Sequence, residues 1–289
     1  MKPMTLLTGA GGKTGRALIR TLSKTGSVCA FIHREEHAPV LKSLGAEKVI
    51  VGDMRDKVAI RPAMEGVRAV YHVCPNMSPD EVVIGRLVIS EATTAGVEHF
   101  VYHSVLHPQI EVMNHHWQKM LVEEMLFESG LPFTILQPAP YMQNLLAGWK
   151  SIVEDGVLRV PYSVTSKFSF VDLEDVAEAA NIVLTQPNHV NAIYELAGTP
   201  PLSHVEVAEI FSRVLKRDIR VEKEEIGDWS LRAPVMSNYT VENLVKMFEY
   251  YDRWGLVGNP NVLGWILKRE STSLEMFVER TLNQLDVIQ

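Results

Sequence analysis

Cysteine is scarce in this chain, with only two among 289 residues. Cys29 and Cys74 each lie within an apolar run of the kind that forms a buried strand. We therefore interpret both as reduced core thiols of a cytoplasmic protein rather than as the two halves of a disulfide.

Surplus basic charge and long apolar runs are missing as well. The formal net charge is −7 and the pI is about 5.8. This balance disfavours a nucleic-acid partner, because such proteins usually present a basic face. No apolar run has the length of a membrane span, and the first residues resemble the start of a strand rather than a targeting segment. We expect neither nucleic acid nor a membrane as a partner.

Apolar, strand-like runs alternate with helical patterns through the first half of the chain. Strands are predicted over residues 5–8, 28–33, 48–51, 69–73, 99–103 and 133–137, and helices over 15–24, 38–44, 56–64, 81–95 and 116–129. Strands that are apolar on both faces and alternate with helices are typical of a parallel sheet covered on both sides. The predicted fold class is α/β, with a Rossmann-type doubly wound parallel sheet.

Prolines become frequent after residue 137, and the pattern changes. Further strands are expected over 192–196 and 219–224, and further helices over 238–254 and 273–285. Hydrophobic residues make up 46% of the chain, and no repeat or low-complexity linker divides it. We predict a Rossmann domain over 1–150, to which 168–186 returns, and a smaller C-terminal α/β lobe over 151–289.

Three glycines, at positions 9, 12 and 15, stand directly between the first predicted strand and the first helix. In that setting, backbone N–H groups and a helix N-terminus can face a pyrophosphate. A glycine-rich hairpin is the alternative, but no alternating strand follows. A P-loop would need glycine at position 7, which is leucine. The predicted dinucleotide-binding residues of this turn are Gly9, Gly12, Lys13, Thr14 and Gly15.

Other cofactor contacts are sought where strands end, because ligands of such sheets bind outside the carboxyl ends of the strands. Arg34 follows the second strand and suits a 2′-phosphate. Glu35 and Glu36 would favour a ribose hydroxyl instead, or simply begin the next helix. We expect NADP(H) in preference to NAD(H). Further predicted contacts follow the third and fourth strands: Asp53, Met54 and Pro75. For Asp53, a turn-capping role is the alternative.

Several of these segments together resemble the NmrA-like family of atypical short-chain dehydrogenase/reductases. The resemblance rests on the glycine turn, Gly52-Asp53, His103-Ser104, the block 122–138 and the segment 170–177, and it covers about residues 3–200. It implies a Rossmann domain that binds NADP(H) or NAD(H), and a small C-terminal substrate lobe. Members of the family are either reductases, for example of quinones or dyes, or catalytically silent redox sensors that act through protein partners.

The catalytic positions depart from the wider superfamily, which normally carries Tyr-x-x-x-Lys with the lysine on the nicotinamide ribose. Lys119 matches that lysine, and His115 stands where the tyrosine is expected. The two share a helix face, so His115 could donate a proton near neutral pH, with Ser104 as polar support. The alternatives are that His115 only precedes the helix and that Lys119 is a solvated helix residue. The predicted catalytic residues are Lys119, His115 and Ser104.

Tyr141, Met142 and Asn144 follow the sixth strand, where a substrate would meet the nicotinamide. We predict that they bind substrate; the alternative is a helix start that packs between the lobes. Asp172 and Asp175 are interpreted as helix-capping residues that tie the two lobes together.

Histidines at positions 99, 103 and 107 recur at a spacing of four and are candidate metal ligands. The first two lie on a predicted strand, where a spacing of four gives no compact ligand set. No carboxylate stands between ligands as in His-Glu-x-x-His, so we expect no metal.

These observations predict an NAD(P)H-dependent oxidoreductase that reduces a small planar acceptor, quinone-like or a conjugated carbonyl, by hydride transfer. A quinone needs little help from a general acid, so its reduction does not require the missing tyrosine. The alternative is a catalytically silent NADP(H)-sensing protein that acts through a protein partner. The sequence leaves open whether the chain forms a homodimer or binds a regulatory partner.

Overall fold

The computed structural model describes residues 3–232 and 236–286, which divide into two compact units. The first unit comprises the chain up to residue 137 together with residues 176–194. The second comprises residues 138–175 and the chain from residue 195 onward. The chain therefore leaves the first unit at the end of its sixth strand and returns for most of one helix and part of one strand.

A seven-stranded sheet forms the centre of the first unit, in the order β3-β2-β1-β4-β5-β6-β9. Its strands are β1 (Met4–Leu7), β2 (Ser27–Ile32), β3 (Lys48–Val51), β4 (Ala69–His72), β5 (His99–His103), β6 (Phe133–Pro138) and β9 (Ala192–Leu196). Pairing is parallel from β3 through β6. Because β2 and β4 flank β1, the strand order reverses there, as in doubly wound sheets. The predicted α/β class and sheet type are confirmed.

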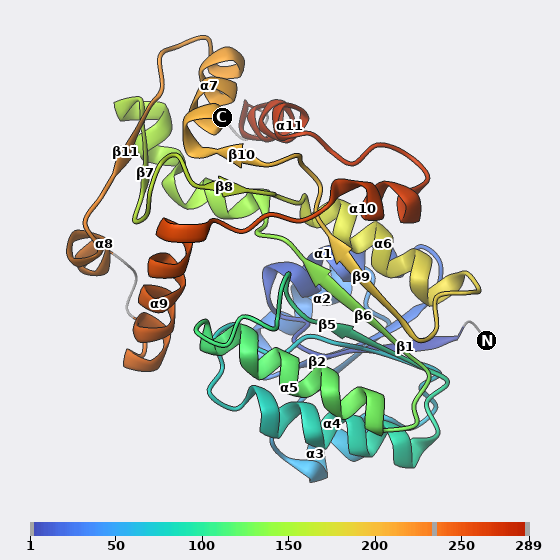
Figure 1. Cartoon of the computed structure of the whole chain (residues 1–289). Coiled ribbons are helices and arrows are strands. Elements are labelled where there is room, and N and C mark those ends of the chain that lie inside the picture. The colour runs from blue at the N-terminus through green and yellow to red at the C-terminus, as the bar shows by residue number, and fades with distance from the viewer. Residues whose placement is uncertain (1–2, 233–235, 287–289) are drawn as a thin grey trace. The chain divides into compact units, whose positions relative to one another are not determined.

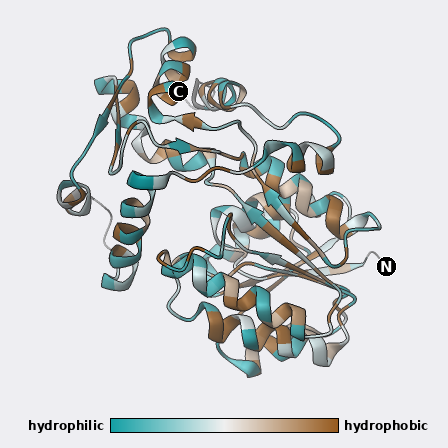
Figure 2. Ribbon diagram, in the orientation of Figure 1, coloured by the Kyte–Doolittle hydropathy of each residue, from teal (hydrophilic) through white to brown (hydrophobic). Residues whose placement is uncertain are grey.

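Helices cover both faces of this sheet. They are α1 (Lys13–Leu22), α2 (Ala38–Ser43), α3 (Lys57–Ala63), α4 (Glu81–Ala95), α5 (Asn114–Glu128) and α6 (Leu173–Thr185), with a short 3₁₀ turn over Glu35–His37. Figure 1 shows α3, α4 and α5 together on one face, and α1, α2 and α6 on the other. In Figure 2 these helices carry hydrophilic and hydrophobic residues side by side, as expected for helices with one buried face.

The core of the first unit lies on both faces of the sheet. β2, β4 and β6 are buried along their full length, which explains why their sequences are mostly apolar and do not alternate with polar residues. Cys29 and Cys74 are free thiols within this core, and burial raises the pKa of each. Both are therefore held as neutral thiols, as interpreted from the sequence.

The second unit is built from short elements. Two small sheets pair β8 (Lys167–Phe168) antiparallel with β10 (Leu202–Ser203), and β7 (Val157–Val160) parallel with β11 (Arg220–Lys223). A 3₁₀ helix (Met142–Gly148) and a π-helical turn (Ser151–Asp155) precede them. The helices are α7 (His204–Leu215), α8 (Ile226–Arg232), α9 (Asn238–Trp254), α10 (Pro260–Leu267) and α11 (Leu274–Asp286). Within the described ranges, no helix is long and apolar enough to cross a membrane.

Candidate functional site

The glycine turn between β1 and α1 contains two glycines that the fold itself requires. Gly9 has a φ of +60°, and a Cβ there would lie 2.5 Å from the carbonyl oxygen of Val73. Gly15 lies inside α1, and its Cβ would come within 2.5 Å of the Ala10 backbone. Neither approach is sterically allowed, so these positions need glycine for the turn and for close packing of the helix.

Gly12 differs, because the fold places no such demand on it. Its backbone is extended, with φ −77° and ψ 173°, and a Cβ would meet only the Gly9 carbonyl oxygen, at 3.7 Å. Gly12 is the exposed N-cap of α1, and as a glycine it makes no side-chain hydrogen bond to the first turn of the helix. The helix N-terminus is therefore open to an anion, and the missing side chain leaves room for one. Both features fit the phosphates of a dinucleotide.

Thr8 fastens the turn to the end of β4. Its hydroxyl accepts a hydrogen bond from the Val73 backbone N–H at 2.9 Å and lies 2.8 Å from Nδ1 of His72. Both side chains are fully buried, and desolvation lowers the pKa of His72 to about 4. A neutral imidazole thus helps to fix the turn. Sequence reasoning missed this pair, which only the β1–β4 pairing brings together.

The other predicted cofactor residues of the turn and of the strand ends differ in exposure. Arg34 is exposed at the end of β2, and its guanidinium lies 3.3 Å from a carboxylate oxygen of the equally exposed Glu36. A surface pair of this kind holds its partners weakly. Arg34 can therefore turn to an anionic ligand. Lys13 and Pro75 are exposed, Thr14 is half-buried and Met54 is buried.

Asp53 is already engaged. The backbone N–H of Arg55 donates to Oδ1 at 2.8 Å, and the Arg55 guanidinium donates to both carboxylate oxygens. Arg55 also pairs with Asp80 at 3.1 Å. The hydrogen bonds from Arg55 hold the pKa of Asp53 at about 2. This arrangement corresponds to the turn-capping alternative, and an adenine amino group would have to compete with Arg55.

Lys119 lies on α5, with its ammonium directed to the end of β5. Its Nζ donates to Oε1 of Glu81 at 3.0 Å and to the backbone oxygen of His103 at 3.3 Å. It also lies 5.3 Å from the centre of the Tyr102 ring. The Tyr102 hydroxyl donates to the same Glu81 oxygen at 2.7 Å. Lys119 is therefore not a solvated helix lysine, and its acidic partner was not foreseen.

Ser104, directly after β5, belongs to a second buried polar group, which includes Glu123, one turn beyond Lys119 on α5. Its hydroxyl donates to Oε1 of Glu123, and the Gln137 amide donates to both oxygens of that carboxylate, at 2.9 and 3.0 Å. Burial raises the pKa of Glu123, although the hydrogen bonds from Ser104 and Gln137 act in the opposite direction and lower it. Glu123 follows Lys119 by four residues, so helical spacing could have indicated it from the sequence.

His115 has surroundings that disfavour an imidazolium. Burial, followed by the charges of His116 and Lys119, lowers the pKa of His115 to about 2. Its Nδ1 is buried and has no hydrogen-bond partner among the described residues. The residue is half-buried, and with this lowered pKa the imidazole is neutral near pH 7. This lowered pKa differs from the ordinary histidine pKa assumed in the sequence analysis, and the role of His115 as proton donor stays a prediction.

The predicted substrate residues fall in the second unit. The Met142 backbone N–H donates to the Val171 carbonyl oxygen at 2.9 Å, which ties the start of the 3₁₀ helix to the segment before α6. Met142 is buried, Tyr141 half-buried and Asn144 exposed. Of the three, Asn144 is the most accessible to a ligand.

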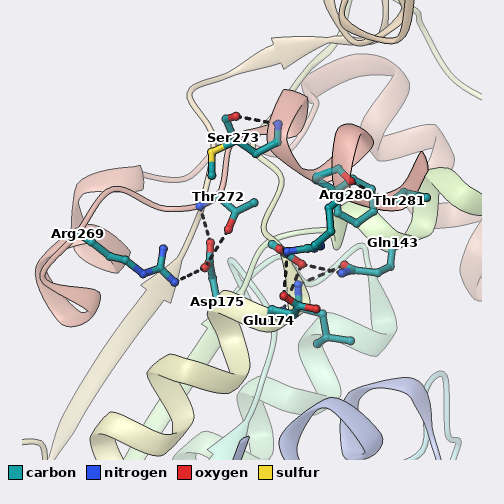
Figure 3. Close-up of polar contacts among 12 residues, drawn as sticks. Gln143, Glu174, Asp175, Arg269, Thr272, Ser273, Arg280 and Thr281 are labelled. Carbon is teal, nitrogen blue, oxygen red and sulfur yellow. Dashed lines mark hydrogen bonds and ion pairs between the residues drawn. The ribbon is translucent and has the colours of Figure 1, made fainter. Parts of the chain in front are cut away.

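Two buried carboxylates at the start of α6 organise the same unit. Gln143 donates to Oδ1 of Asp172 at 2.7 Å, and Arg280 of α11 donates to Oδ2 at 2.6 Å. Asp175 accepts from Arg269 and from the Thr272 backbone N–H, each at 2.6 Å. Figure 3 shows Arg269 and Thr272 converging on Asp175. Within the second unit, these contacts join Arg269, Thr272 and Arg280 to the two carboxylates.

Histidines, cysteines and carboxylates are the side chains that could hold a metal ion. Within residues 3–232 and 236–286, no group of three or more such side chains is placed to hold a metal ion. His99 instead lies 2.8 Å from the Thr134 hydroxyl, and His103 lies 2.7 Å from the Tyr71 hydroxyl.

Known proteins resemble this chain over most of its length. An NAD(P)H azoreductase of Xenophilus azovorans is 32% identical over 220 residues, which cover 75% of this chain and 76% of the relative. The crystal structure of an NADPH-dependent quinone oxidoreductase of Escherichia coli is 25% identical, with a TM-score of 0.82, and the match covers 96% of this chain and 100% of that one.

A third similarity extends to the fold alone. The structure of NmrA, a negative transcriptional regulator, in complex with NAD matches with a TM-score of 0.80 at 19% identity, over 96% of this chain and 94% of that one. The model of the NmrA-like family matches residues 1–283. This chain belongs to the NmrA-like family.

Proposed function

We propose that this protein is an NAD(P)H-dependent reductase that transfers hydride to a small planar acceptor, a quinone or a conjugated carbonyl. Gly12 carries the proposal, because a glycine that the fold does not need stands at an uncapped helix N-terminus beside the β1 switch point. The 32% identity to an NAD(P)H azoreductase and the 25% identity to a quinone oxidoreductase support the reaction class.

Each part of the first unit has a role in this proposal. Backbone N–H groups of the glycine turn bind the pyrophosphate, and Arg34 binds the adenosine 2′-phosphate, so that NADP(H) is preferred over NAD(H). Lys119 donates to a hydroxyl of the nicotinamide ribose. The nicotinamide supplies the hydride when it is bound. In the second unit, Tyr141 and Asn144 are proposed to meet the acceptor.

The choice of acceptor follows from the state of His115. Its pKa of about 2 leaves it neutral at physiological pH, so the site offers no imidazolium at the position of the usual tyrosine. An acceptor that takes its protons from water does not need one. Quinones have this property, whereas a simple ketone depends on a general acid at its oxygen. A neutral His115 therefore supports a quinone-type acceptor in this proposal.

The same observation keeps a second candidate function open. A protein that binds NADP(H) without turnover also needs no proton donor at position 115. It would report the cofactor's redox state to a partner protein. Steady NADPH oxidation in the presence of acceptors separates the two functions, because only the reductase sustains it.

The cofactor site is tested by Gly12→Val, which places side-chain atoms where the phosphates are proposed to lie. We expect a folded protein with no measurable NADPH binding by calorimetry. Gly26→Val is the matched control. Gly26 lies just before β2, at the amino ends of the parallel strands, and a Cβ there would meet nothing closer than 3.4 Å. Unchanged affinity in folded Gly12→Val would refute the site.

A further inference from the structure

Glu81 is a buried carboxylate whose contacts converge on the predicted ribose-binding lysine. It is the first residue of α4, and its side chain is 5% exposed. One oxygen, Oε1, accepts from both the Tyr102 hydroxyl at 2.7 Å and the Lys119 ammonium at 3.0 Å. Burying a carboxylate is costly unless it is paired and hydrogen-bonded. Lys119 supplies the ion pair and Tyr102 a hydrogen bond, and the Cys74 thiol is a further hydrogen-bond neighbour of Glu81.

The bonds of Lys119 leave part of its capacity unused. An ammonium group has three N–H donors. Among the described residues, Glu81 and the His103 carbonyl take one each, and the side chain keeps 14% of its surface exposed. One donor therefore remains for a ligand at the end of β5. The two bonds also remove most of the rotational freedom of a long side chain, which a ligand would otherwise have to restrict on binding.

We infer that Glu81 is a positioning residue, which holds Lys119 so that its remaining N–H meets a hydroxyl of the nicotinamide ribose. The inference rests on the proposed function, since it needs Lys119 to bind the cofactor. The Tyr102 hydroxyl donates to the same Glu81 oxygen as Lys119, and the three side chains act as one unit. Glu81 itself touches no reacting atom.

Glu91 provides a matched comparison on the same helix. It is as buried as Glu81, with 2% of its side chain exposed, and it is also ion-paired, to Lys57 at 3.1 Å and Arg61 at 2.8 Å. Those partners belong to α3 rather than to a strand end. A purely structural loss on α4 should therefore be reproduced at Glu91, and a loss that acts through Lys119 should not.

The test measures NADPH affinity by calorimetry in wild type, Lys119→Ala, Glu81→Gln, Glu91→Gln and the double variant Glu81→Gln/Lys119→Ala. We expect about tenfold weaker binding in Lys119→Ala and in Glu81→Gln, on the scale of one charge-assisted hydrogen bond. Glu91→Gln should bind as wild type. The double variant should be no weaker than Lys119→Ala alone, since residues that act as a unit are not additive.

Three results would overturn the inference: Glu81→Gln affinity equal to wild type, equal losses in Glu81→Gln and Glu91→Gln, or additive losses in the double variant. If Lys119→Ala binds NADPH as wild type does, the assignment of Lys119 under the proposed function fails instead. Should Glu81→Gln not fold, Tyr102→Phe removes one bond to Glu81 and keeps the ion pair. That variant should bind NADPH several-fold more weakly, and full affinity would contradict the inference.

Discussion

Single charges at the carboxyl ends of the strands set which dinucleotide the protein is expected to prefer. Arg34 is exposed beside Glu36, and such a pair contributes little by itself. A doubly charged 2′-phosphate can outcompete the Glu36 carboxylate for the guanidinium, because it offers more charge and more acceptor oxygens. The proposed preference for NADP(H) therefore depends on the Arg34 side chain.

Arg34→Ala should weaken NADPH binding by about 1.5–3 kcal/mol, the scale of a charged hydrogen bond, and should leave NADH binding nearly unchanged. Calorimetric titration with both cofactors measures this. Arg68→Ala is the control. Arg68 also forms an exposed pair, with Glu98, but it lies just before β4, at the amino ends of the parallel strands. Equal losses for both cofactors would show that Arg34 is structural.

His115 gives a prediction for the pH dependence of turnover. With its pKa lowered to about 2, the imidazole is neutral throughout the neutral range, so no proton is lost from it as pH rises through about 6.5. The rate ratio of wild type to His115→Phe should stay constant between about pH 6 and 8. A wild-type rate that falls through this range, with a flat profile in the variant, would restore His115 as the acid.

For single residues, the sequence predicted those site positions that one residue type or one spacing is enough to indicate. Glycines at 9 and 15 have a steric reason in the fold, and the spacing of Gly12 to both places it at the N-terminus of α1. The Glu81–Lys119 pair could not be predicted, since a glutamate at a helix start usually indicates a dipole effect in solvent. Only the packing of α4 against α5 buries it.

Among the elements, β4, β5 and α5 of the first unit carry an unusual number of neutral histidines. Burial lowers the pKa to about 4 for His72, His99 and His116, to about 3 for His103 and to about 2 for His115. In the unfolded chain these groups bind protons below about pH 6.5, whereas in the folded protein they do not.

The unfolded state therefore gains protons first as pH falls, and stability should decline from about pH 7 to 5, by on the order of 1 kcal/mol per buried histidine. Urea denaturation across this range measures it. His99→Gln should reduce the slope, and His33→Gln, which removes an exposed histidine, should not. Stability that is independent of pH in wild type would contradict the neutral burial of these side chains.

The start of α6 gives a second prediction for an element. Asp172 is fully buried, and Arg280 is its only cationic partner in the described part of the chain, at 2.6 Å. Arg280→Met would leave that carboxylate unpaired, at a cost of about 3 kcal/mol of unfolding free energy. Arg68→Met breaks the exposed pair with Glu98, also at 2.6 Å, and should cost less than about 1 kcal/mol. Similar losses in both would show that burial of Asp172 does not matter.

Element boundaries follow the strength of the local pattern. The strand over 48–51 and the helix over 81–95 were predicted to the residue, because each is long or apolar enough to stand out. The two-residue strands β8 and β10 offer no period to detect. α7 was missed although Ser203 and Glu206 form its capping box, a signal that the sequence contains.

On the scale of the whole molecule, the sequence predicted the doubly wound sheet and the NmrA-like family, and both are confirmed. The glycine turn and the parallel strands dictate these properties. The acceptor is not dictated in this way, because it depends on a few side chains of the second unit, such as Tyr141 and Asn144, whose short surrounding elements carry no periodic signal. The acceptor class therefore stays a proposal that rests on His115 and on the reductase relatives.

Steady oxidation of NADPH by the purified protein, with a panel of quinones and azo dyes, tests the proposed reductase most directly. Folded Gly12→Val supplies the background rate, because it is expected to lack the cofactor site while retaining the fold. The proposal predicts sustained oxidation by wild type above that background with at least one quinone. Tight NADPH binding by wild type, with oxidation no faster than in Gly12→Val for every acceptor, would contradict it and favour the cofactor-sensing function.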